Sequence, residues 1–360
     1  MNTIGTSFRL TSIGESHGKL VGVVLDGCPA GLTLDKERLQ ADLNRRRPGQ
    51  SKVSTTRDEK DKAMVLTGIY KGVTTGAPIT MIINNTDKDS SKYHEMRWTP
   101  RPGHADYNAE LRYGGYQDPR GGGRFSGRNT APLVMAGVVA KQLLETLGTR
   151  IIAYTQQIGD ITTPIMNPEN IEETNIVRCP HPETAEAMIS LIEETRDSGD
   201  SVGGKVRCVA LHPPVGLGQP IFDTIEGDIA KALYGIPAVK AVEFGAGVNY
   251  AGMKGSEAND QFIIRDGSIV TETNNCGGVL GGITHGMPIE VCVTFKPTPS
   301  IGRTQRTIDI KKMKETSLTI EGRHDPCIVP RAVPIVEAMM AVTLVDHALR
   351  AGKIKQVLGV

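Results

Sequence analysis

The sequence predicts a mixed α+β or α/β fold built as one domain over residues 1–360. Short apolar runs typical of strands alternate with helix-period segments along the whole chain. No Pro-rich, Ser-rich or low-complexity linker divides the chain, and 360 residues can bury a large core without disulfides or metals. These observations favour one domain of strands and helices over an all-α or all-β protein.

Strands are expected where apolar residues alternate or run together between turn residues. The expected strands are 8–13, 20–25, 64–69, 79–83, 151–154, 206–211, 239–244 and 289–295. Helices are expected where apolar residues recur with a period near 3.6 between capping residues. The clearest helices are 35–46, 131–147, 183–196, 221–234 and 332–349.

A weak internal repeat relates a segment in the middle of the chain to one near its C-terminal end. Residues 124–128 (RFSGR) precede the helix at 131–147, and residues 323–325 (RHD) precede the helix at 332–349. Two related α/β halves would explain the repeat, and so would chance, because a polar loop before a core helix is common.

Composition excludes several classes of partner. Lys and Arg total 41 against 40 for Asp and Glu, so a net charge of +1 gives no field that favours nucleic acid or an anionic membrane. The N-terminus lacks a secretory pattern, and no apolar run approaches the roughly 18 residues that span a bilayer. The six cysteines form no C-x-x-C pair, which predicts reduced thiols and no metal site. A cytoplasmic protein without nucleic-acid or membrane partners is expected.

Two basic or titratable segments lie in the N-terminal region. His17 stands between glycines in GESHG, where an exposed imidazole suits acid-base chemistry near neutrality, although a turn histidine with a structural role is the alternative. Three arginines, Arg45–Arg47, end the first helix before Pro-Gly. Such residues complement the helix dipole, and one or two of them would face a cleft.

The glycine-rich middle of the chain predicts an anion site. Residues 101–106 (RPGHAD) are followed by 120–128 (RGGGRFSGR), which lead into an apolar helix. Glycines expose backbone N–H groups and a helix N-terminus adds positive potential, so the segment suits a phosphate or carboxylate. It matches neither a P-loop nor a Rossmann fingerprint, and a flexible surface loop is the alternative.

Two C-terminal segments carry polar side chains on stiff turns. Residues 296–300 (KPTPS) follow a strand and offer an ammonium and two hydroxyls, although alone they are only a turn. Residues 322–326 (GRHDP) precede the last apolar helix, where an isolated R-x-D is otherwise a plain ion pair.

Taken in order, these segments resemble the chorismate synthase family from about residue 3 to beyond residue 337. The similarity is carried by residues 14–31 (GESHGKLVGVVLDGCPAG), 123–137 (GRFSGRNTAPLVMAG), 323–339 (RHDPCIVPRAVPIVEAM) and the RPGHAD motif. The resemblance implies a carbon-oxygen lyase that removes phosphate and a ring proton from 5-enolpyruvylshikimate 3-phosphate in a 1,4-anti elimination. The product is chorismate, at the last step of the shikimate pathway.

The resemblance also implies a cofactor and catalytic residues. Reduced FMN is required without net redox change, because an electron-rich flavin can lend density to the breaking C–O bond. His17 resembles the acid that protonates the leaving phosphate, and His104 the residue that serves the reduced flavin. Asp325 resembles the base that receives the ring proton by way of the flavin.

Binding residues follow by family position. The implied substrate contacts are Arg46, Lys52, Arg101, Ser126, Arg128 and Arg323. Arg46 and Lys52 also match positions assigned to a nicotinamide phosphate, and the two assignments stay open. The implied FMN contacts are Arg124, Phe125, Ser126, Pro237, Ala238, Gly281, Lys296, Pro297, Thr298, Pro299, Ser300 and Arg323. Phe125 stands where Ser is common in the family and Pro237 where Asn is common, so two flavin hydrogen bonds are in question.

Fold and assembly are implied in the same way. The family fold is a β-α-β sandwich that assembles as a homotetramer, with each active site largely within one protomer. NADPH is expected only as an indirect reductant that acts through an external flavin reductase, because no nicotinamide fingerprint is present. Two alternatives are a non-catalytic flavin- or phosphate-binding protein and an NADPH-dependent flavin reductase.

Overall fold

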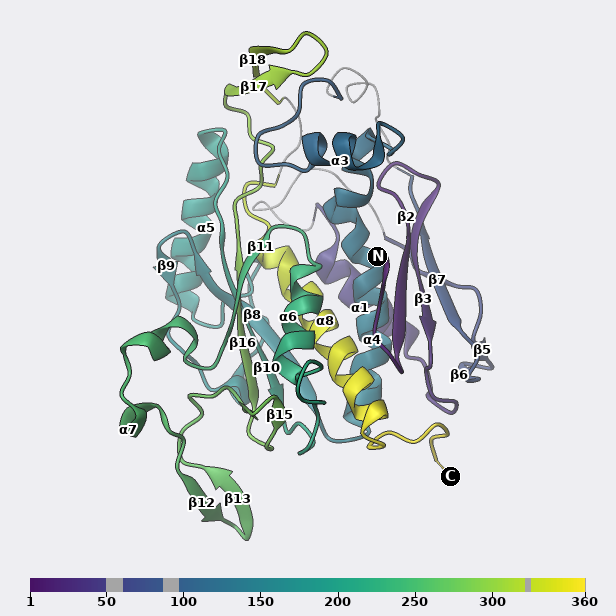
Figure 1. The fold of residues 1–360 in the computed structure, drawn as a ribbon, viewed down its shortest axis with the longest axis vertical. Helices are drawn as coiled ribbons and strands as arrows, with labels where there is room; N and C mark the ends of the chain where they lie inside the picture. The colour runs from purple at the N-terminus through teal and green to yellow at the C-terminus, as the bar shows by residue number, and fades with distance from the viewer. Residues whose placement is uncertain (50–60, 87–96, 321–324, 360) are drawn as a thin grey trace.

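The protein is a sandwich in which a layer of helices separates two five-stranded antiparallel sheets (Figure 1). The computed structural model describes residues 1–49, 61–86, 97–320 and 325–359. Its buried apolar side chains form one cluster that runs from Phe8 to Ile354 and includes residues of both sheets and of the helices between them. The predicted mixed fold and β-α-β sandwich are confirmed.

The first sheet has the strand order β1-β2-β3-β7-β4. Its strands are β1 (Thr3–Ile4), β2 (Arg9–Gly14), β3 (Leu20–Asp26), β7 (Ile79–Asn84) and β4 (Met64–Val65). Val21, Val23 and Leu25 alternate along β3 and are fully buried, as expected for a sheet face that packs on helices. β5 (Ile69–Tyr70) and β6 (Val73–Thr74) form a small separate hairpin.

The second sheet has the order β11-β16-β10-β8-β9. Its strands are β11 (Val239–Phe244), β16 (Ile289–Phe295), β10 (Gly204–Leu211), β8 (Arg150–Ile158) and β9 (Ile161–Thr162). β16 alternates between buried and partly exposed residues along its whole length, and its buried set is Ile289, Val291, Val293 and Phe295. This period of two is the sequence signal that predicted the strand.

The helical layer contains the two most buried helices, α4 (Ala131–Glu145) and α8 (Val329–Arg350), which pack on each other. α1 (Lys36–Arg46) contacts both of them, and α6 (Ile225–Tyr234) lies between α8 and β11. Gly137 of α4 lies so close to Ala338 of α8 that a Cβ at position 137 would overlap it. Asp346 of α8 accepts the backbone N–H groups of Thr6, Ser7 and Phe8 at 2.6–2.8 Å, which ties the last helix to the first sheet.

Several boundaries differ from the predicted ones for local reasons. The helix expected at 221–234 begins only at Ile225, because the Thr224 side chain accepts the Gly227 N–H and caps it there. The strand expected at 64–69 is two short pieces, β4 and β5. The described residues also form the helices α3 (Asp106–Tyr113), α5 (Pro182–Asp197) and α7 (Gly255–Ala258), of which α5 was expected.

α8 is long and apolar enough to cross a membrane by length and composition, so the prediction that no apolar run approaches this length is wrong. Its apolar window is entirely buried inside the protein, however. A helix that is apolar on all sides and enclosed by protein is a core helix.

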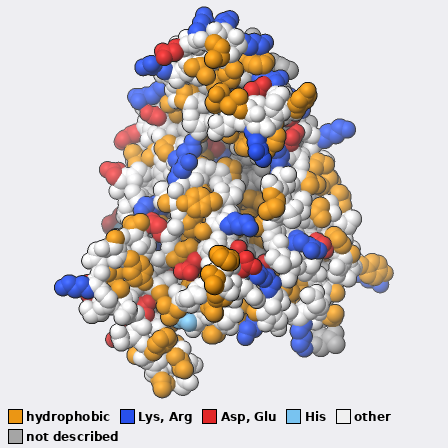
Figure 2. Space-filling model, in the orientation of Figure 1, with side chains coloured by type: hydrophobic (Ala, Val, Ile, Leu, Met, Phe, Trp, Pro, Cys, Tyr) orange, Lys and Arg blue, Asp and Glu red, His pale blue; other side chains and the backbone are white. Residues whose placement is uncertain are grey.

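Three further hairpins project from the sandwich, and two of them mark opposite ends of the molecule (Figure 1). They are β12–β13 (Phe262–Arg265 and Ser268–Thr271), β14–β15 (Val279–Leu280 and Ile283–Thr284) and β17–β18 (Gln305–Asp309 and Lys314–Leu318). Lys and Arg side chains gather over β17–β18 at the top of the face in Figure 2, whereas hydrophobic side chains cover β12–β13 at the lower tip.

The β17–β18 hairpin is joined to the segment that contains Trp98. The backbone N–H of Ile310 donates to the Trp98 carbonyl at 2.9 Å. Two cations lie over the Trp98 ring, with Arg97 at 4.8 Å and Lys311 at 4.2 Å from the ring centroid. This segment leads directly to Arg101 and His104.

Candidate active site

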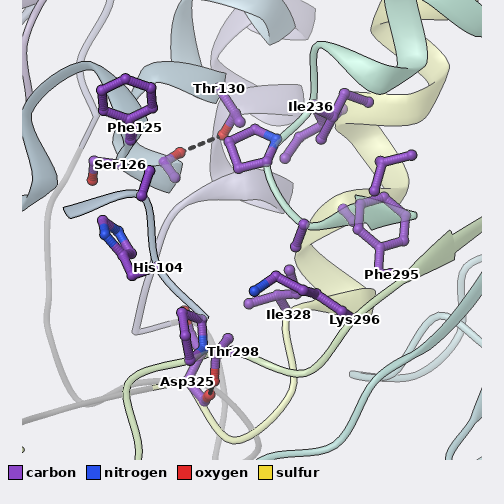
Figure 3. A pocket seen from close by; sticks show the side chains of 18 of the residues that line it. His104, Phe125, Ser126, Thr130, Ile236, Phe295, Lys296, Thr298, Asp325 and Ile328 are labelled. Carbon is purple, nitrogen blue, oxygen red and sulfur yellow. Dashed lines mark hydrogen bonds between the residues drawn. The ribbon is translucent and has the colours of Figure 1, made fainter. Parts of the chain in front are cut away.

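A cavity of about 570 Å³ opens at one end of the helical layer. Its wall is formed by the C-terminal ends of α1 and α6, the loop around His104, the glycine loop before α4, the turn after β16 and the start of α8. Figure 3 shows His104, Ser126 and Asp325 on one side of this space, and Lys296 beside the apolar side chains of Phe295 and Ile328 on the other, with Ile236 nearby. Segments far apart in sequence therefore converge on one site.

The cavity is strongly basic although the chain is nearly neutral. Among the described residues, the cationic side chains that line it are Arg46, Arg101, Arg124, Lys240, Lys296 and Arg331. Asp325 is the one carboxylate in the described part of the lining. Because the protein carries a net charge of only +1, this concentration is local and favours a ligand with several negative charges.

The RPGHAD motif folds into a compact cluster of charges. Asp106, the first residue of α3, accepts two hydrogen bonds from Arg101 at 2.7 and 2.8 Å and lies 2.6 Å from His104 Nδ1. Burial alone would raise the pKa of Asp106, but hydrogen bonds from Arg101 and His104 outweigh it and hold the pKa well below the usual range. Asp106 therefore fixes the orientation of both neighbours at the cavity wall.

The glycine loop separates the two histidines. Gly121, Gly122 and Gly123 all have positive φ values, and Gly121 lies so close to His17 that a Cβ there would overlap the imidazole. A Cβ at Gly122 would lie 3.3 Å from the His104 ring. The absent side chains thus let the backbone pass between the imidazoles. His17 is buried and does not itself line the cavity, but Gly121 does.

Ser16 lies beside His17 under the same loop. Its hydroxyl is buried and has no hydrogen-bond partner within the described ranges. A buried polar atom without a partner is costly, so it points to a group that the protein alone does not supply.

Arg46 and Arg128 are held by a shared carboxylate. Asp61 accepts from Arg46 Nη1 at 2.9 Å and also pairs with Arg128 Nη1. The two arginines lower the pKa of Asp61 despite its burial, which acts in the opposite direction. Arg46 lines the cavity, whereas Arg128 lies behind it and donates to Asn85 at 3.0 Å.

The turn after β16 brings a second group of polar residues to the cavity. Lys296, Thr298, Pro299 and Ser300 line it, and Lys296 Nζ donates to the Gly103 carbonyl. Burial, and then the charge of Lys240, lower the pKa of Lys296. Two neighbouring ammonium groups would be stabilised by an anion between them.

Asp325 lies beside this turn. Its carboxylate pairs with Arg331 of α8, and its backbone carbonyl accepts from Thr298 Oγ1 at 2.8 Å. The Asp325 side chain is 13% exposed, so it faces the cavity from a nearly enclosed position.

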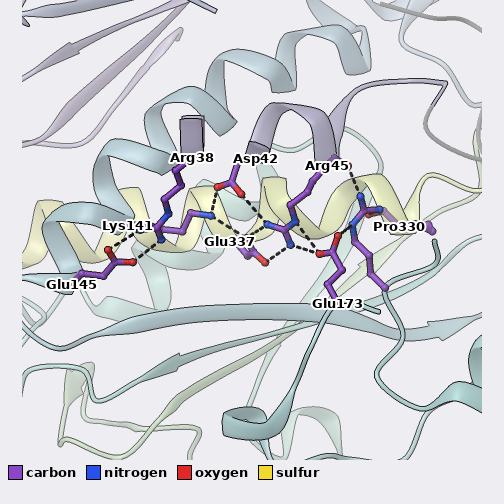
Figure 4. A network of polar contacts seen from close by, with 9 residues as sticks. Arg38, Asp42, Arg45, Lys141, Glu145, Glu173, Pro330 and Glu337 are labelled. Carbon is purple, nitrogen blue, oxygen red and sulfur yellow. Dashed lines mark hydrogen bonds and ion pairs between the residues drawn. The ribbon is translucent and has the colours of Figure 1, made fainter. Parts of the chain in front are cut away.

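A buried polar network behind the cavity holds the end of α1 in place (Figure 4). Glu337 of α8 pairs with Arg45 at 2.7 Å and with Lys141 of α4 at 3.1 Å, and Lys141 also pairs with Asp42. Burial would raise the pKa of Glu337, but Arg45 and Lys141 lower it to about 2. Because Arg45 precedes Arg46, this network determines where the Arg46 side chain enters the cavity.

Most of the residues predicted for the site meet at this cavity. Those that line it are Arg46, Arg101, His104, Arg124, Phe125, Ser126, Pro237, Ala238, Lys296, Thr298, Pro299, Ser300 and Asp325. Four predicted residues of the described part do not line it: His17, Arg128, Pro297 and Gly281. His17 lies against Gly121 of the lining, and Arg128 shares Asp61 with Arg46. Lys52 and Arg323 lie outside the described residues.

Gly281 is the predicted residue that the structure does not bring to the others. It lies in the turn of the β14–β15 hairpin, and its neighbour Gly282 packs against Thr224 at the start of α6. The cavity lies at the other end of α6, where Tyr234 and Gly235 form part of its wall. A ten-residue helix is about 15 Å long, so Gly281 is remote from the cavity of its own protomer.

Sequence reasoning missed Asp106, Asp61, Lys240 and Arg331. Asp106 stands inside the quoted RPGHAD motif, so a signal for it was present. Arg331 stands inside the 323–339 segment, but nothing in its spacing shows that it returns to Asp325. Asp61 and Lys240 have no motif around them, and only the folded chain brings them to the site.

The fold and the site define an enzyme that binds a small polyanionic molecule in a cavity with acid-base groups on its walls. The chorismate synthase profile matches residues 8–349. A chorismate synthase of Dehalococcoides mccartyi is 49% identical over 360 residues, which cover 99% of each chain. One from Korarchaeum cryptofilum is 51% identical over 350 residues, which cover 96% of this chain and 97% of the relative. This chain therefore belongs to the chorismate synthase family.

Solved structures agree with this assignment. A crystal structure of a chorismate synthase superposes with a TM-score of 0.73 at 30% sequence identity, covering 97% of this chain and 93% of the other. The similarity therefore extends over nearly the whole sandwich and both sheets.

Proposed function

We propose that the chain eliminates phosphate and a ring proton from 5-enolpyruvylshikimate 3-phosphate to give chorismate, in the shikimate pathway of aromatic amino acid biosynthesis. The observation that carries this proposal is the convergence of six cationic side chains, His104 and Asp325 on one cavity. The substrate has two carboxylates and a phosphate, which need such a set in an otherwise neutral protein.

The substrate is bound by the arginine side of the cavity. We assign Arg46, Arg101 and Ser126 to its anionic groups, with Arg128 behind Arg46 and with Lys52 and Arg323 completing the set. A guanidinium that is already oriented by a carboxylate, as Arg46 is by Asp61, loses little side-chain entropy when it binds. This preorganisation supports Arg46 as a contact for an anionic group of the substrate.

Proton transfer is assigned to three residues. His17 donates a proton to the leaving phosphate, and Gly121 supports this role because it admits the imidazole to the back of the cavity wall. Asp325 is the final acceptor of the ring proton. His104 serves the reduced flavin, and its contact with Asp106 keeps the imidazole in one orientation.

The same cavity fits reduced FMN. Its apolar wall, which includes Ile236, Phe295 and Ile328, suits a flavin ring, and its lysines suit a phosphate. The residues assigned to hold the cofactor are Arg124, Phe125, Ser126, Pro237, Ala238, Lys296, Pro297, Thr298, Pro299 and Ser300, with Gly281 and Arg323 from the family pattern. Bound reduced FMN supplies an electron-rich ring that assists cleavage of the C–O bond without net oxidation.

Assembly and surroundings follow the family pattern. We propose a cytoplasmic homotetramer without nucleic-acid or membrane partners that receives reduced flavin from an external reductase, with NADPH only as the indirect reductant. Exposed apolar side chains on the β12–β13 hairpin support association with further copies: Phe262 is 65%, Ile264 80% and Ile269 74% exposed.

The test is phosphate release from 5-enolpyruvylshikimate 3-phosphate under anaerobic conditions with chemically reduced FMN. We expect stoichiometric phosphate and chorismate, and no turnover with oxidised FMN. An exposed histidine outside the cavity, His212, provides the control, because His212→Asn removes an imidazole without touching the site. Absence of phosphate release with fully reduced flavin would refute the proposal.

A further inference from the structure

Arg331 is one of the cationic residues that line the cavity, and the assignments above give it no individual role. It lies in the first turn of α8, and its guanidinium makes two contacts in different directions. Nη1 pairs with the Asp325 carboxylate, and Nε donates to the backbone carbonyl of Arg46 at 3.0 Å. One side chain therefore connects the proposed proton acceptor with the end of α1.

The Arg46 carbonyl belongs to the last turn of α1, where carbonyl groups have no partner within the helix. The Arg46 side chain meanwhile points the other way, to Asp61 and Thr130. The contact with Arg331 thus fixes the backbone of a substrate-binding arginine relative to Asp325.

Within the described residues, Asp325 has contacts through its backbone and through its carboxylate. Thr298 Oγ1 donates to the Asp325 carbonyl, and the Val202 N–H donates to the next carbonyl, that of Pro326, at 2.8 Å. Both contacts hold the backbone only. The planar fork of Arg331, which is 16% exposed, holds the carboxylate itself.

We propose that Arg331 is a positioning residue that fixes the Asp325 carboxylate in the orientation needed to accept the ring proton. The inference depends on the proposed function, because it assigns Arg331 to the same reaction. A base contributes fully only when its acceptor oxygen is held in place, so loss of Arg331 impairs proton removal more than substrate binding.

Arg178 offers a matched control. It is also a largely buried arginine that donates to a carbonyl near the end of α1, that of Arg45, and to the Pro330 carbonyl, both at 2.8 Å. Its third described hydrogen bond goes to Glu173 at 2.9 Å, so the contacts described for it differ from those of Arg331. The Arg178→Met substitution therefore removes contacts that only connect α1 with α8, and it keeps the contact between Arg331 and Asp325.

The experiment compares Arg331→Met, Arg331→Lys and Arg178→Met, each alone and combined with Asp325→Asn. Steady-state kinetics with reduced FMN give kcat and KM, and substrate deuterated at the carbon that loses the proton gives the isotope effect. Thermal unfolding and binding of oxidised FMN report folding. Arg331→Met is expected to lower kcat about 100-fold with less than a threefold change in KM, and to raise the isotope effect.

Three comparisons decide the inference. Arg331→Lys, which keeps the charge beside Asp325, should retain at least about a third of wild-type kcat. Arg178→Met should leave the isotope effect unchanged. In the Asp325→Asn background, Arg331→Met should lower kcat by less than about twofold, because the two residues act as one unit.

Failure of the inference and failure of the proposed function give different results. If the wild type releases no phosphate, the proposed function is wrong. If the wild type is active but Arg331→Met keeps wild-type kcat, or its effect multiplies with that of Asp325→Asn, only the assignment of Arg331 is wrong. Should Arg331→Met not fold, equal impairment of a folded Arg331→Lys without a raised isotope effect overturns the assignment.

Discussion

At the scale of single residues, the glycine loop shows that missing side chains make room for two imidazoles. Gly121 has φ +59° and contacts the His17 ring, and Gly123, with φ +51° and ψ −122°, occupies a conformation open essentially to glycine. The loop can therefore lie between both imidazoles only with this composition.

Gly121→Ala is expected to displace His17 and lower kcat by roughly 10² or more, because a Cβ overlaps the imidazole. Activity with reduced FMN measures this. Gly148→Ala is the control, since Gly148 has φ +77° but open space around it. It should cost about 1–2 kcal/mol of stability and leave kcat unchanged. Equal effects of both substitutions would show that backbone strain, not the His17 contact, matters.

His104→Ala and His17→Ala should each lower kcat by ~10²–10⁴ without a large change in thermal stability. His104 lies 2.6 Å from Asp106, so Asp106→Asn should reproduce part of the His104→Ala loss. Kinetics of the three variants, together with His212→Asn, check this. Unchanged rates in either histidine variant would exclude that residue from the reaction.

Residues at the site were predictable where a motif carries them. The segments around His17, Arg101, Arg124 and Asp325 resemble the family in sequence and in order. That resemblance predicted that these residues belong to one site. Local pattern cannot predict that Asp61 reaches two arginines, because that contact depends on how a loop returns to α1 and α4. Gly281 shows the opposite limit: its family position was clear, but the fold places it at the far end of α6.

At the scale of elements, the contact among α1, α4 and α8 depends on buried charge. Asp42 and Arg45 from α1, Lys141 from α4 and Glu337 from α8 form one network (Figure 4). Removing one member leaves charges without compensation in a nonpolar surrounding, which costs more than losing an exposed pair.

Glu337→Gln should lower the free energy of unfolding by about 3–5 kcal/mol at neutral pH. The pKa of Glu337 is lowered from 4.5 to about 2, so its contribution is complete above about pH 4.5 and is lost as the pH falls toward 2. The difference between wild type and variant should therefore shrink over that range in denaturant titrations. Glu145→Gln, which breaks the exposed pair with Arg38, should cost less than about 1 kcal/mol at every pH. A pH-independent difference for Glu337→Gln would contradict the role of its charge.

The helices and long strands were predictable because their apolar periods are strong. β16 matches its predicted range in full, and α4 and α8 differ by a few residues at their ends. The β12–β13 and β17–β18 hairpins were missed, because their exposed strands have no buried face to impose a period of two. The order of strands in each sheet was not predicted, since antiparallel pairing leaves no trace in the spacing of apolar residues.

At the scale of the whole molecule, the protein combines one continuous core with projecting apolar hairpins. We propose that the chain folds as a single unit over residues 1–360, as the cluster from Phe8 to Ile354 suggests. An apolar hairpin on an isolated chain exposes nonpolar surface to water, so we expect another copy of the chain to cover it.

Replacing Phe262 and Ile264 together by Lys is expected to dissociate the proposed tetramer, because charges on the hairpin oppose burial against another copy. Sedimentation velocity measures the change. Ile165→Lys is the control, since Ile165 is 73% exposed in a loop outside the hairpin. A monomeric wild type, or an unchanged tetramer in the double variant, would contradict this arrangement.

The protein contains a single tryptophan, Trp98, in contact with Arg97 and Lys311 on the segment that leads to Arg101. Its tryptophan emission therefore originates from one indole, on the segment that carries two residues of the site. Displacement of either neighbouring charge shifts the wavelength of that emission, and a bound flavin quenches it by energy transfer. Ligand occupancy can thus be followed optically in the unlabelled protein.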